Sequence, residues 1–185
     1  MTNKKDSILS GLLGERITVR KVRGQIVITN RPRRQLLAPS DKQKAAQARF
    51  REASQYATRQ IDQPDSLKLY QRGITAKKNS AYTVAISDYF NAPKVHSIDI
   101  IGYKGHAGDV ITVKATDDFM VTAVKVSIID ANGTVIEEGD ACLDVEKINL
   151  WVYVTTTANA ALRGTTIRAV AYDKPGNTGV VEVKL

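Results

Sequence analysis

Hydrophobic and polar residues change their spacing along the chain near Pro93. Before it, apolar and polar residues alternate through residues 16–30 on either side of Gly24, which predicts a β-hairpin. Apolar residues then recur every three or four positions in 40–62 and in 80–91, which predicts two helices. After Pro93, short β-branched runs replace the helical spacing.

Both predicted helices begin at residues that favour helix starts. Ser40 and Gln43 form a capping-box pattern at the first helix, which Pro64 ends, and Ser80 is the expected N-cap of the second. Residues 65–70 are expected to form a short helical turn. The apolar positions that should pair the two helices are Ala46, Phe50, Ala53, Ala57 and Ile61 in the first, and Tyr82, Ala85, Ile86, Tyr89 and Phe90 in the second.

Seven β-rich runs, separated by turn residues about every ten positions, fill the second half of the chain. This spacing indicates a β-sandwich. The runs are 96–103, 110–116, 121–130, 133–139, 148–157, 165–173 and 178–184. We therefore predict an α+β protein, with an N-terminal β-hairpin plus helices in residues 1–93 and a C-terminal seven-stranded β-sandwich in residues 94–185.

Composition narrows the kinds of site that the chain can hold. Of its 185 residues, 43% are apolar and 25% charged, which suits a packed globule. Its one cysteine, Cys142, cannot form an internal disulfide, and two histidines cannot build a His-rich metal site. No apolar run reaches 18 residues, so we expect no membrane span. The apolar stretch 8–13 precedes no small-residue cleavage site, so we expect an intracellular or virion-internal protein without a signal peptide.

Positive charge is concentrated in the first half of the chain. Residues 1–93 carry 18 Lys and Arg against 7 Asp and Glu, a net charge of +11, whereas residues 94–185 have a net charge of −3. Such asymmetry indicates that the two halves face different partners. Seven of the nineteen residues in 16–34 are basic.

Arginines on a two-stranded ribbon and a following helix can contact phosphates. The predicted contact residues for nucleic acid or another polyanion are Arg16, Arg20, Lys21, Arg23, Arg31, Arg33, Arg34, Lys42 and Arg49, and Lys44, Arg51 and Arg59 would extend that surface. A solvated basic face, or one docked on an acidic neighbour, accounts for the same pattern.

The other polar clusters are better explained as turn and strand residues than as metal-binding or catalytic groups. Asp117, Asp118, Asp173 and Asn177 could supply oxygens for calcium, but Asp and Asn are also ordinary turn residues, and we favour turns. We expect Glu137 and Glu138 to lie at a solvated strand end, and Cys142 to be a small apolar strand residue. We predict no catalytic residue, metal, cofactor or small-molecule substrate, and therefore no enzyme.

The second half resembles a bacterial immunoglobulin-like, or fibronectin type III-like, domain. The resemblance covers residues 95–185 and rests on four segments: Val113–Asp118, Val124–Gly133, Trp151–Tyr153 and Ala169–Asn177. It implies an immunoglobulin-like β-sandwich and says little about activity, and the Cys-Trp-Cys pattern of antibody domains is absent. The first half resembles the N-terminal module of small uncharacterised bacterial proteins, through Gly11–Gly14, the basic hairpin, Arg31–Arg34 and the helix around Phe50.

Three classes of function remain open. The first is a non-enzymatic structural or assembly protein, such as a virion component, whose basic module docks to a scaffold, to itself or to nucleic acid while the sandwich is a spacer or interaction module. The second is a nucleic-acid-binding protein that uses the hairpin and helix. The third is a surface adhesion module, which the missing signal sequence disfavours.

Overall fold

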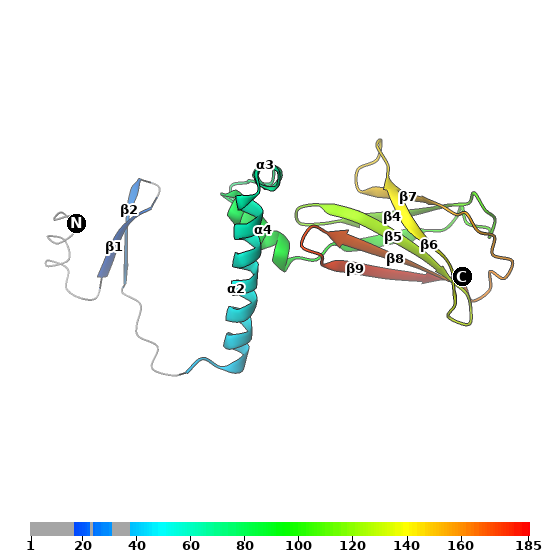
Figure 1. Cartoon of the computed structure of the whole chain (residues 1–185), viewed down its shortest axis with the longest axis horizontal. Coiled ribbons are helices and arrows are strands. Elements are labelled where there is room, and N and C mark those ends of the chain that lie inside the picture. The colour runs from blue at the N-terminus through cyan, green and yellow to red at the C-terminus, as the bar shows by residue number, and fades with distance from the viewer. Residues whose placement is uncertain (1–16, 23, 31–37) are drawn as a thin grey trace. The chain divides into compact units, whose positions relative to one another are not determined.

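A computed structural model describes residues 17–22, 24–30 and 38–185 and confirms the α+β fold class. The chain divides into two compact units, Met1–Ala45 and Ala46–Leu185 (Figure 1). The boundary near residue 93, drawn from sequence, stays a prediction. Within the described residues, no helix is long and apolar enough to cross a membrane.

The first unit contains the predicted β-hairpin, formed by β1 (Ile17–Val22) and β2 (Gln25–Asn30). The strands are antiparallel, and Val19 pairs with Ile28. Gly24, at the turn, has a φ of 82°, a conformation that glycine adopts without steric cost. The side chains of Ile26 and Ile28 are 67% and 58% exposed.

Helix α2 (Asp41–Asp62) begins with the predicted capping box. The amide of Gln43 donates to Ser40 Oγ at 3.3 Å, and the amide of Ser40 donates to Gln43 Oε1 at 2.9 Å. The predicted apolar face is only partly correct, because Ala46 is exposed and Phe50 is 54% exposed. Its buried residues are Ala53, Tyr56 and Ala57, all in the C-terminal half of the helix.

Two shorter helices follow, α3 (Pro64–Gln71) and α4 (Ala81–Phe90). Ser80 caps α4 as predicted, since its Oγ accepts from the Thr83 amide. The predicted apolar face of α4 is only partly correct, since it shares Ala85 with the buried face. Tyr82 is exposed, whereas Ala81, Val84, Ala85 and Asp88 are buried. With 10 and 8 residues, α4 and α3 are too short to cover the 22 residues of α2, so these two helices leave the start of α2 uncovered.

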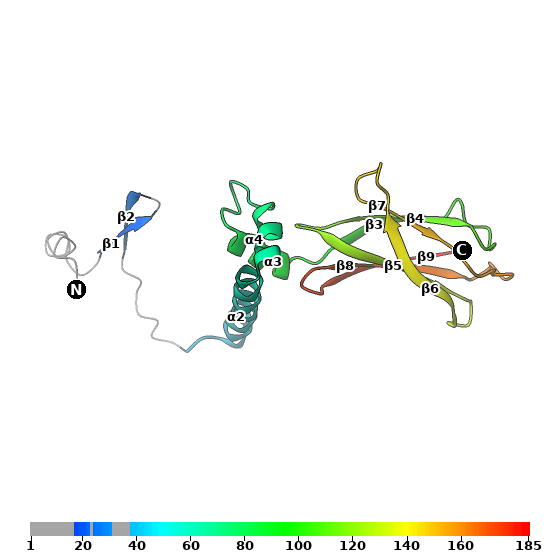
Figure 2. The ribbon, with the colours of Figure 1, turned by 45° about the horizontal axis from the view of Figure 1, so that its top comes forward.

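The predicted seven strands form the β-sandwich. They are β3 (Lys94–Asp99), β4 (Val110–Thr116), β5 (Val121–Ile129), β6 (Val135–Leu143), β7 (Leu150–Val154), β8 (Thr166–Asp173) and β9 (Thr178–Lys184). All neighbours are antiparallel, in the order β3-β4-β7-β6-β5-β8-β9. Strand β6 passes from one layer to the other, because it pairs with β5 over most of its length and with β7 only at Cys142 and Leu143. Figure 2 shows the two layers.

The sandwich core consists of inward-facing residues from both layers. Trp151 and Tyr153 are buried side by side on one face of β7. The opposite layer contributes alternate residues of β5 and β8, which match the spacing of two expected in a strand. The buried set includes Val95, Ile98, Ile111, Val113, Val124, Val126, Ile128, Ile167, Ala169 and Ala171.

Candidate functional site

Few of the predicted polyanion-contact residues have a described environment. Arg16, Arg23, Arg31, Arg33 and Arg34 lie outside the described residues. Arg20 and Lys21 are on β1, where Lys21 is exposed, and Lys42 and Arg49 are exposed on α2. Their role in polyanion contact stays a prediction.

Arg49 lies against an aromatic patch that we define by Arg49, Phe50 and Phe90. Its guanidinium carbon is 5.0 Å from the centre of the Phe90 ring, and its Nη2 donates to the Phe90 carbonyl at 3.4 Å. The rings of Phe50 and Phe90 stack with their centroids 6.4 Å apart. Arg49 and Phe50 are exposed and Phe90 is half-buried, and aromatic and arginine side chains are enriched in protein interfaces.

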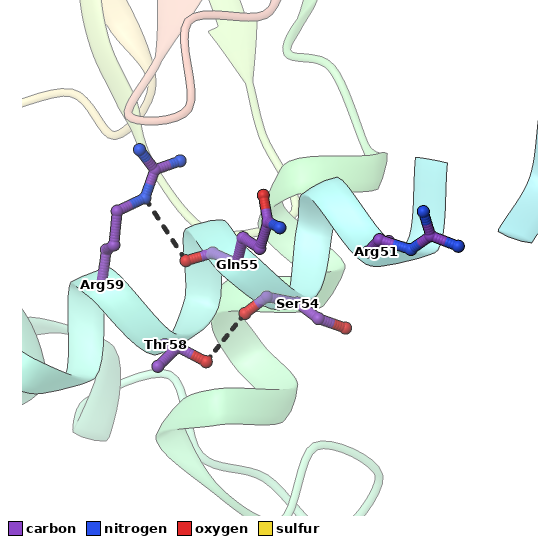
Figure 3. A pocket seen from close by; sticks show the side chains of 5 residues that line it. All are labelled: Arg51, Ser54, Gln55, Thr58 and Arg59. Atoms are coloured by element: carbon purple, nitrogen blue, oxygen red, sulfur yellow. Dashed lines mark hydrogen bonds between the residues drawn. The ribbon is translucent and has the colours of Figure 1, made fainter. Parts of the chain in front are cut away.

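A second group of polar residues follows another face of α2. Arg51, Ser54, Gln55, Thr58 and Arg59 line a shallow depression of about 460 Å³ (Figure 3). Thr58 Oγ1 donates to the Ser54 carbonyl at 2.9 Å, and Arg59 Nε donates to the Gln55 carbonyl at 3.4 Å. The remaining guanidinium N–H groups, with the amide of Gln55, can donate to an anion. We call these five residues the polar row of α2.

The helices of the second unit are anchored to the sandwich through Asp118, in the turn between β4 and β5. Its Oδ2 accepts from Lys78 Nζ at 2.5 Å, Ser87 Oγ at 2.6 Å and Asn91 Nδ2 at 3.2 Å. Burial works to raise the pKa of Asp118, but the hydrogen bonds from Lys78 and Ser87 outweigh it and hold the pKa below its ordinary value. One carboxylate therefore joins the loop before α4, α4 itself and the residue after it to the β-sandwich.

Aromatic packing strengthens the same junction. The rings of Tyr70 on α3 and Phe119 in the β4–β5 turn stack with centroids 4.6 Å apart. A Cβ added to Gly73 would lie 2.9 Å from the Phe119 side chain and 2.7 Å from the Val84 side chain. Any larger residue at this position would therefore collide with these side chains. On the neighbouring β8–β9 turn, Asn177 Nδ2 donates to the Tyr89 carbonyl at 3.3 Å.

A buried polar chain runs through the junction, and the sequence analysis did not identify it. Tyr70 donates to Asp88 Oδ2 at 2.5 Å, so the hydrogen bond of 2.7 Å between Tyr56 and Tyr70 must be donated by Tyr56. Burial is the largest cause that raises the pKa of Tyr56 to about 12 and that of Asp88 to about 7. The signal in the sequence is an aspartate seven residues after Ala81, on the same helical face.

The acidic turn residues act as we favoured, by capping backbone amides. Asp117 Oδ2 accepts from the amides of Phe119 and Met120, and Asp173 Oδ1 accepts from those of Gly176 and Asn177. Nowhere in the described residues do three or more acidic, His or Cys side chains gather as a metal ion would need.

One prediction about an individual strand residue was wrong. Glu137 is buried, because its carboxylate accepts hydrogen bonds from Tyr153, Thr156 and Thr157. Cys142 is a strand residue, as predicted, and it is exposed, because it lies opposite Val152 on the outer face of the sheet. Alternation along a strand separates its residues into two faces. It does not show which face is buried when each face carries both polar and apolar residues.

Comparison with known proteins gives only distant structural matches. No protein-family model matches the chain, and no curated protein matches it. CopC from Methylosinus trichosporium OB3b is 13% identical with a TM-score of 0.33, and the match covers 49% of this chain and 86% of CopC. A tetra-tandem repeat in the extending region of a large adhesion protein is 16% identical with a TM-score of 0.33, covering 50% of this chain and 22% of that one.

Likeness at these TM-scores carries no inference about ligand or activity. What the strand order and core define is an α+β protein with an immunoglobulin-like β-sandwich at its C-terminal end. The resemblance of the first half to small bacterial proteins stays a prediction.

Proposed function

We propose that this protein is a non-enzymatic structural protein that assembles with further copies of itself through its basic N-terminal module, while the immunoglobulin-like domain acts as a spacer or interaction module. The observation that carries the proposal is the exposure of α2. Every residue from Asp41 to Glu52 is exposed, whereas Ala53, Tyr56 and Ala57 are buried. About half of a long helix is thus left open for a partner.

The buried half of α2 is packed against α4, which supports the use of the exposed half as a binding surface for a partner. Tyr56 packs on Tyr89 with ring centroids 5.5 Å apart, and α4 is held to the sandwich by Asp118. A partner bound at the start of α2 would therefore be connected to the β-sandwich through packed side chains. The aromatic patch, in which Arg49 and Phe50 are exposed, offers an anchor of the kind that dominates interface energies.

Self-association tests this proposal directly. We expect light scattering after size-exclusion chromatography to show a mass that rises with protein concentration, and Phe50→Glu to shift it toward the monomer. Val180→Glu is the matched control, because Val180 on β9 is 52% exposed, close to the 54% of Phe50. A monomer at every concentration, or equal effects of both variants, would contradict assembly through α2.

The polar row of α2 favours a second candidate function, contact with nucleic-acid phosphates. Arg, Ser, Gln and Thr side chains are those that proteins use to hold phosphate oxygens, and the row contains all four types. Arg51 and Arg59 are eight positions apart, which is about 12 Å along a helix. No aromatic side chain belongs to the row, so a duplex suits it better than a stacked single strand.

Binding of random duplex DNA at several salt concentrations tests this second candidate. The double variant Arg51→Ala/Arg59→Ala should reduce the slope of log affinity against log salt by about two, since each lost phosphate contact removes about 0.9. Lys104→Ala/Lys184→Ala removes the same charge from exposed positions of the sandwich and should leave the slope nearly unchanged. Equal slopes for both double variants would rule out specific contacts by the polar row.

A further inference from the structure

Two carboxyl groups at the junction of helices and sandwich each hold one oxygen that is buried without a hydrogen-bond partner. Asp88 is fully buried, and its Oδ1 has no partner. The same is true of Oδ1 of Asp117, whose other oxygen accepts from the amides of Phe119 and Met120. A buried carboxylate oxygen without a donor is costly, so two of them in one junction require an explanation.

No neighbouring hydroxyl supplies the missing donor. The Tyr70 hydroxyl already donates its hydrogen bond to Asp88 Oδ2, and the Tyr56 hydroxyl already donates its own to the Tyr70 oxygen. Both phenols keep their protons, because burial is the largest cause that raises the pKa of each. Neither phenol therefore satisfies Oδ1 of Asp88 or of Asp117, whereas one proton held between the two carboxyl groups would satisfy both oxygens.

We propose that Asp88 is a proton-binding switch of the helix–sandwich junction. When protonated, Asp88 donates from Oδ1 to Oδ1 of Asp117, which binds α4 to the β4–β5 turn. When it releases this proton to solvent, two carboxylates remain without a donor between them, and the helices loosen from the sandwich. The inference is independent of the partner in the proposed function.

The charges around Asp88 favour its neutral form. Burial is the main cause that raises its pKa to about 7; the hydrogen bond from Tyr70 opposes this rise, and Asp117 is the strongest charge that adds to it. Lys78, on the loop before α4, is paired with Asp118. The titratable and charged groups that face Asp88 are Tyr56 on α2, Tyr70 on α3, Asp117 and Asp118 in the β4–β5 turn, Lys78, and Asp173 and Lys174 in the β8–β9 turn.

Asp173 is the other buried acid in this set, and its bonding differs. Both of its oxygens have donors, from the amides of Gly176 and Asn177 and from Asn177 Nδ2 at 2.7 Å. Burial raises its pKa as well, but a fully bonded carboxylate does not need a proton to satisfy its oxygens. Asp88 and Asp117 differ from it because each has an oxygen with no donor.

Carboxyl titration of the full chain by ¹³C NMR is the direct test. We expect one aspartate to titrate with a midpoint near pH 7, so that it is about nine-tenths protonated at pH 6. Its signal should be absent from the spectra of Asp88→Asn. Asp117→Asn should lower that midpoint, because it removes the strongest neighbouring charge. A midpoint for Asp88 near 4, or one that Asp117→Asn leaves unchanged, would overturn the proposal.

Hydrogen exchange tests the conformational part. After correction for the intrinsic pH dependence, α4 amides should exchange up to about tenfold faster at pH 8 than at pH 6, since a pH one unit above the pKa favours the charged form tenfold. Asp88→Asn, whose amide can donate to Asp117, should remove this difference and keep exchange slow. Asp99→Asn, at an exposed site on β3, is the control and should behave as the wild type. Equal corrected rates at both pH values in the wild type would show that the proton does not control the junction.

Discussion

Glu137 on β6 shows how one buried carboxylate holds two segments together. It accepts from the Tyr153 hydroxyl at 2.8 Å, from the amide and hydroxyl of Thr156 at 2.6 and 2.8 Å, and from the Thr157 amide at 3.1 Å. Burial opposes its charge, but these hydrogen bonds outweigh burial and lower the pKa of Glu137. It ties β6 to β7 and to the start of the following loop.

We expect Glu137→Gln to lower the free energy of unfolding by about 2–3 kcal/mol, because the amide loses acceptor capacity among buried donors. Since folding lowers the pKa of Glu137, its contribution is present above the unfolded-state pKa and is lost as the pH falls through the folded-state pKa. Urea unfolding of wild type and variant between pH 3 and 7 measures both effects.

Glu182→Gln serves as the control for this experiment. Glu182 pairs with Arg168 at 2.6 Å, but both side chains are nearly half exposed. An exposed pair contributes about 1 kcal/mol or less, so this variant should change stability little. A loss at Glu182 as large as that at Glu137 would contradict the role given to the buried carboxylate.

Gly179 is required by a close approach of backbone to backbone. A Cβ at this position would lie 2.0 Å from the Pro93 carbonyl oxygen, where β9 begins beside the start of β3. Gly179→Ala should therefore cost about 1–3 kcal/mol or more of stability, measured by thermal unfolding. Gly176→Ala meets no atom within 4 Å and strains only a φ of 96°, so it should cost about 1 kcal/mol. The reverse ranking would show that backbone strain outweighs this clash.

Among the elements, the two capped helices should respond differently to loss of the cap. Ser40 caps the exposed start of α2, whereas Ser80 caps α4, which is packed on its Ala81, Val84 and Ala85 side. Ser80→Ala should reduce global stability by about 1 kcal/mol. Ser40→Ala should instead fray the first turn and increase exchange of its amides, with little change in global unfolding, because that turn buries nothing. Chemical denaturation and hydrogen exchange separate the two effects, and equal global losses would contradict the exposure of α2.

Local signals predicted the elements well but not the burial of helical faces. Ser40, Gln43 and Ser80 cap their helices as predicted, since capping depends on residues within one turn. The predicted apolar stripe of α4 was only partly correct, because Ala85 is buried as expected, whereas Tyr82 is exposed and Ala81 and Val84 are buried instead. Which face is buried depends on helices and turns that are distant in sequence.

At the scale of the whole molecule, residues 46–185 should unfold as one cooperative unit. The stack of Tyr70 on Phe119 and the bonds of Asp118 join helices and sandwich. Fluorescence of Trp151 reports on the sandwich, and circular dichroism at 222 nm reports chiefly on the helices. The two should give coincident urea transitions in the wild type.

Phe119→Ala should separate these transitions, with the helices unfolding first, because it removes the aromatic contact between the two parts. Phe50→Ala removes an exposed aromatic ring and is the control that should leave them coincident. Separate transitions already in the wild type would show that the two parts are independent.

The amino-acid sequence alone determined the order and type of elements, the seven-strand sandwich and the two helix caps, because spacing, turn residues and capping act over a few neighbouring positions. Tertiary structure alone decided that Asp88 and Glu137 are buried and that half of α2 is not. The physical reason is that the protonation and burial of a side chain depend on groups brought together from distant parts of the chain. The charges of Asp117 and Asp173 raise the pKa of Asp88 only because α4 packs against two turns of the sandwich.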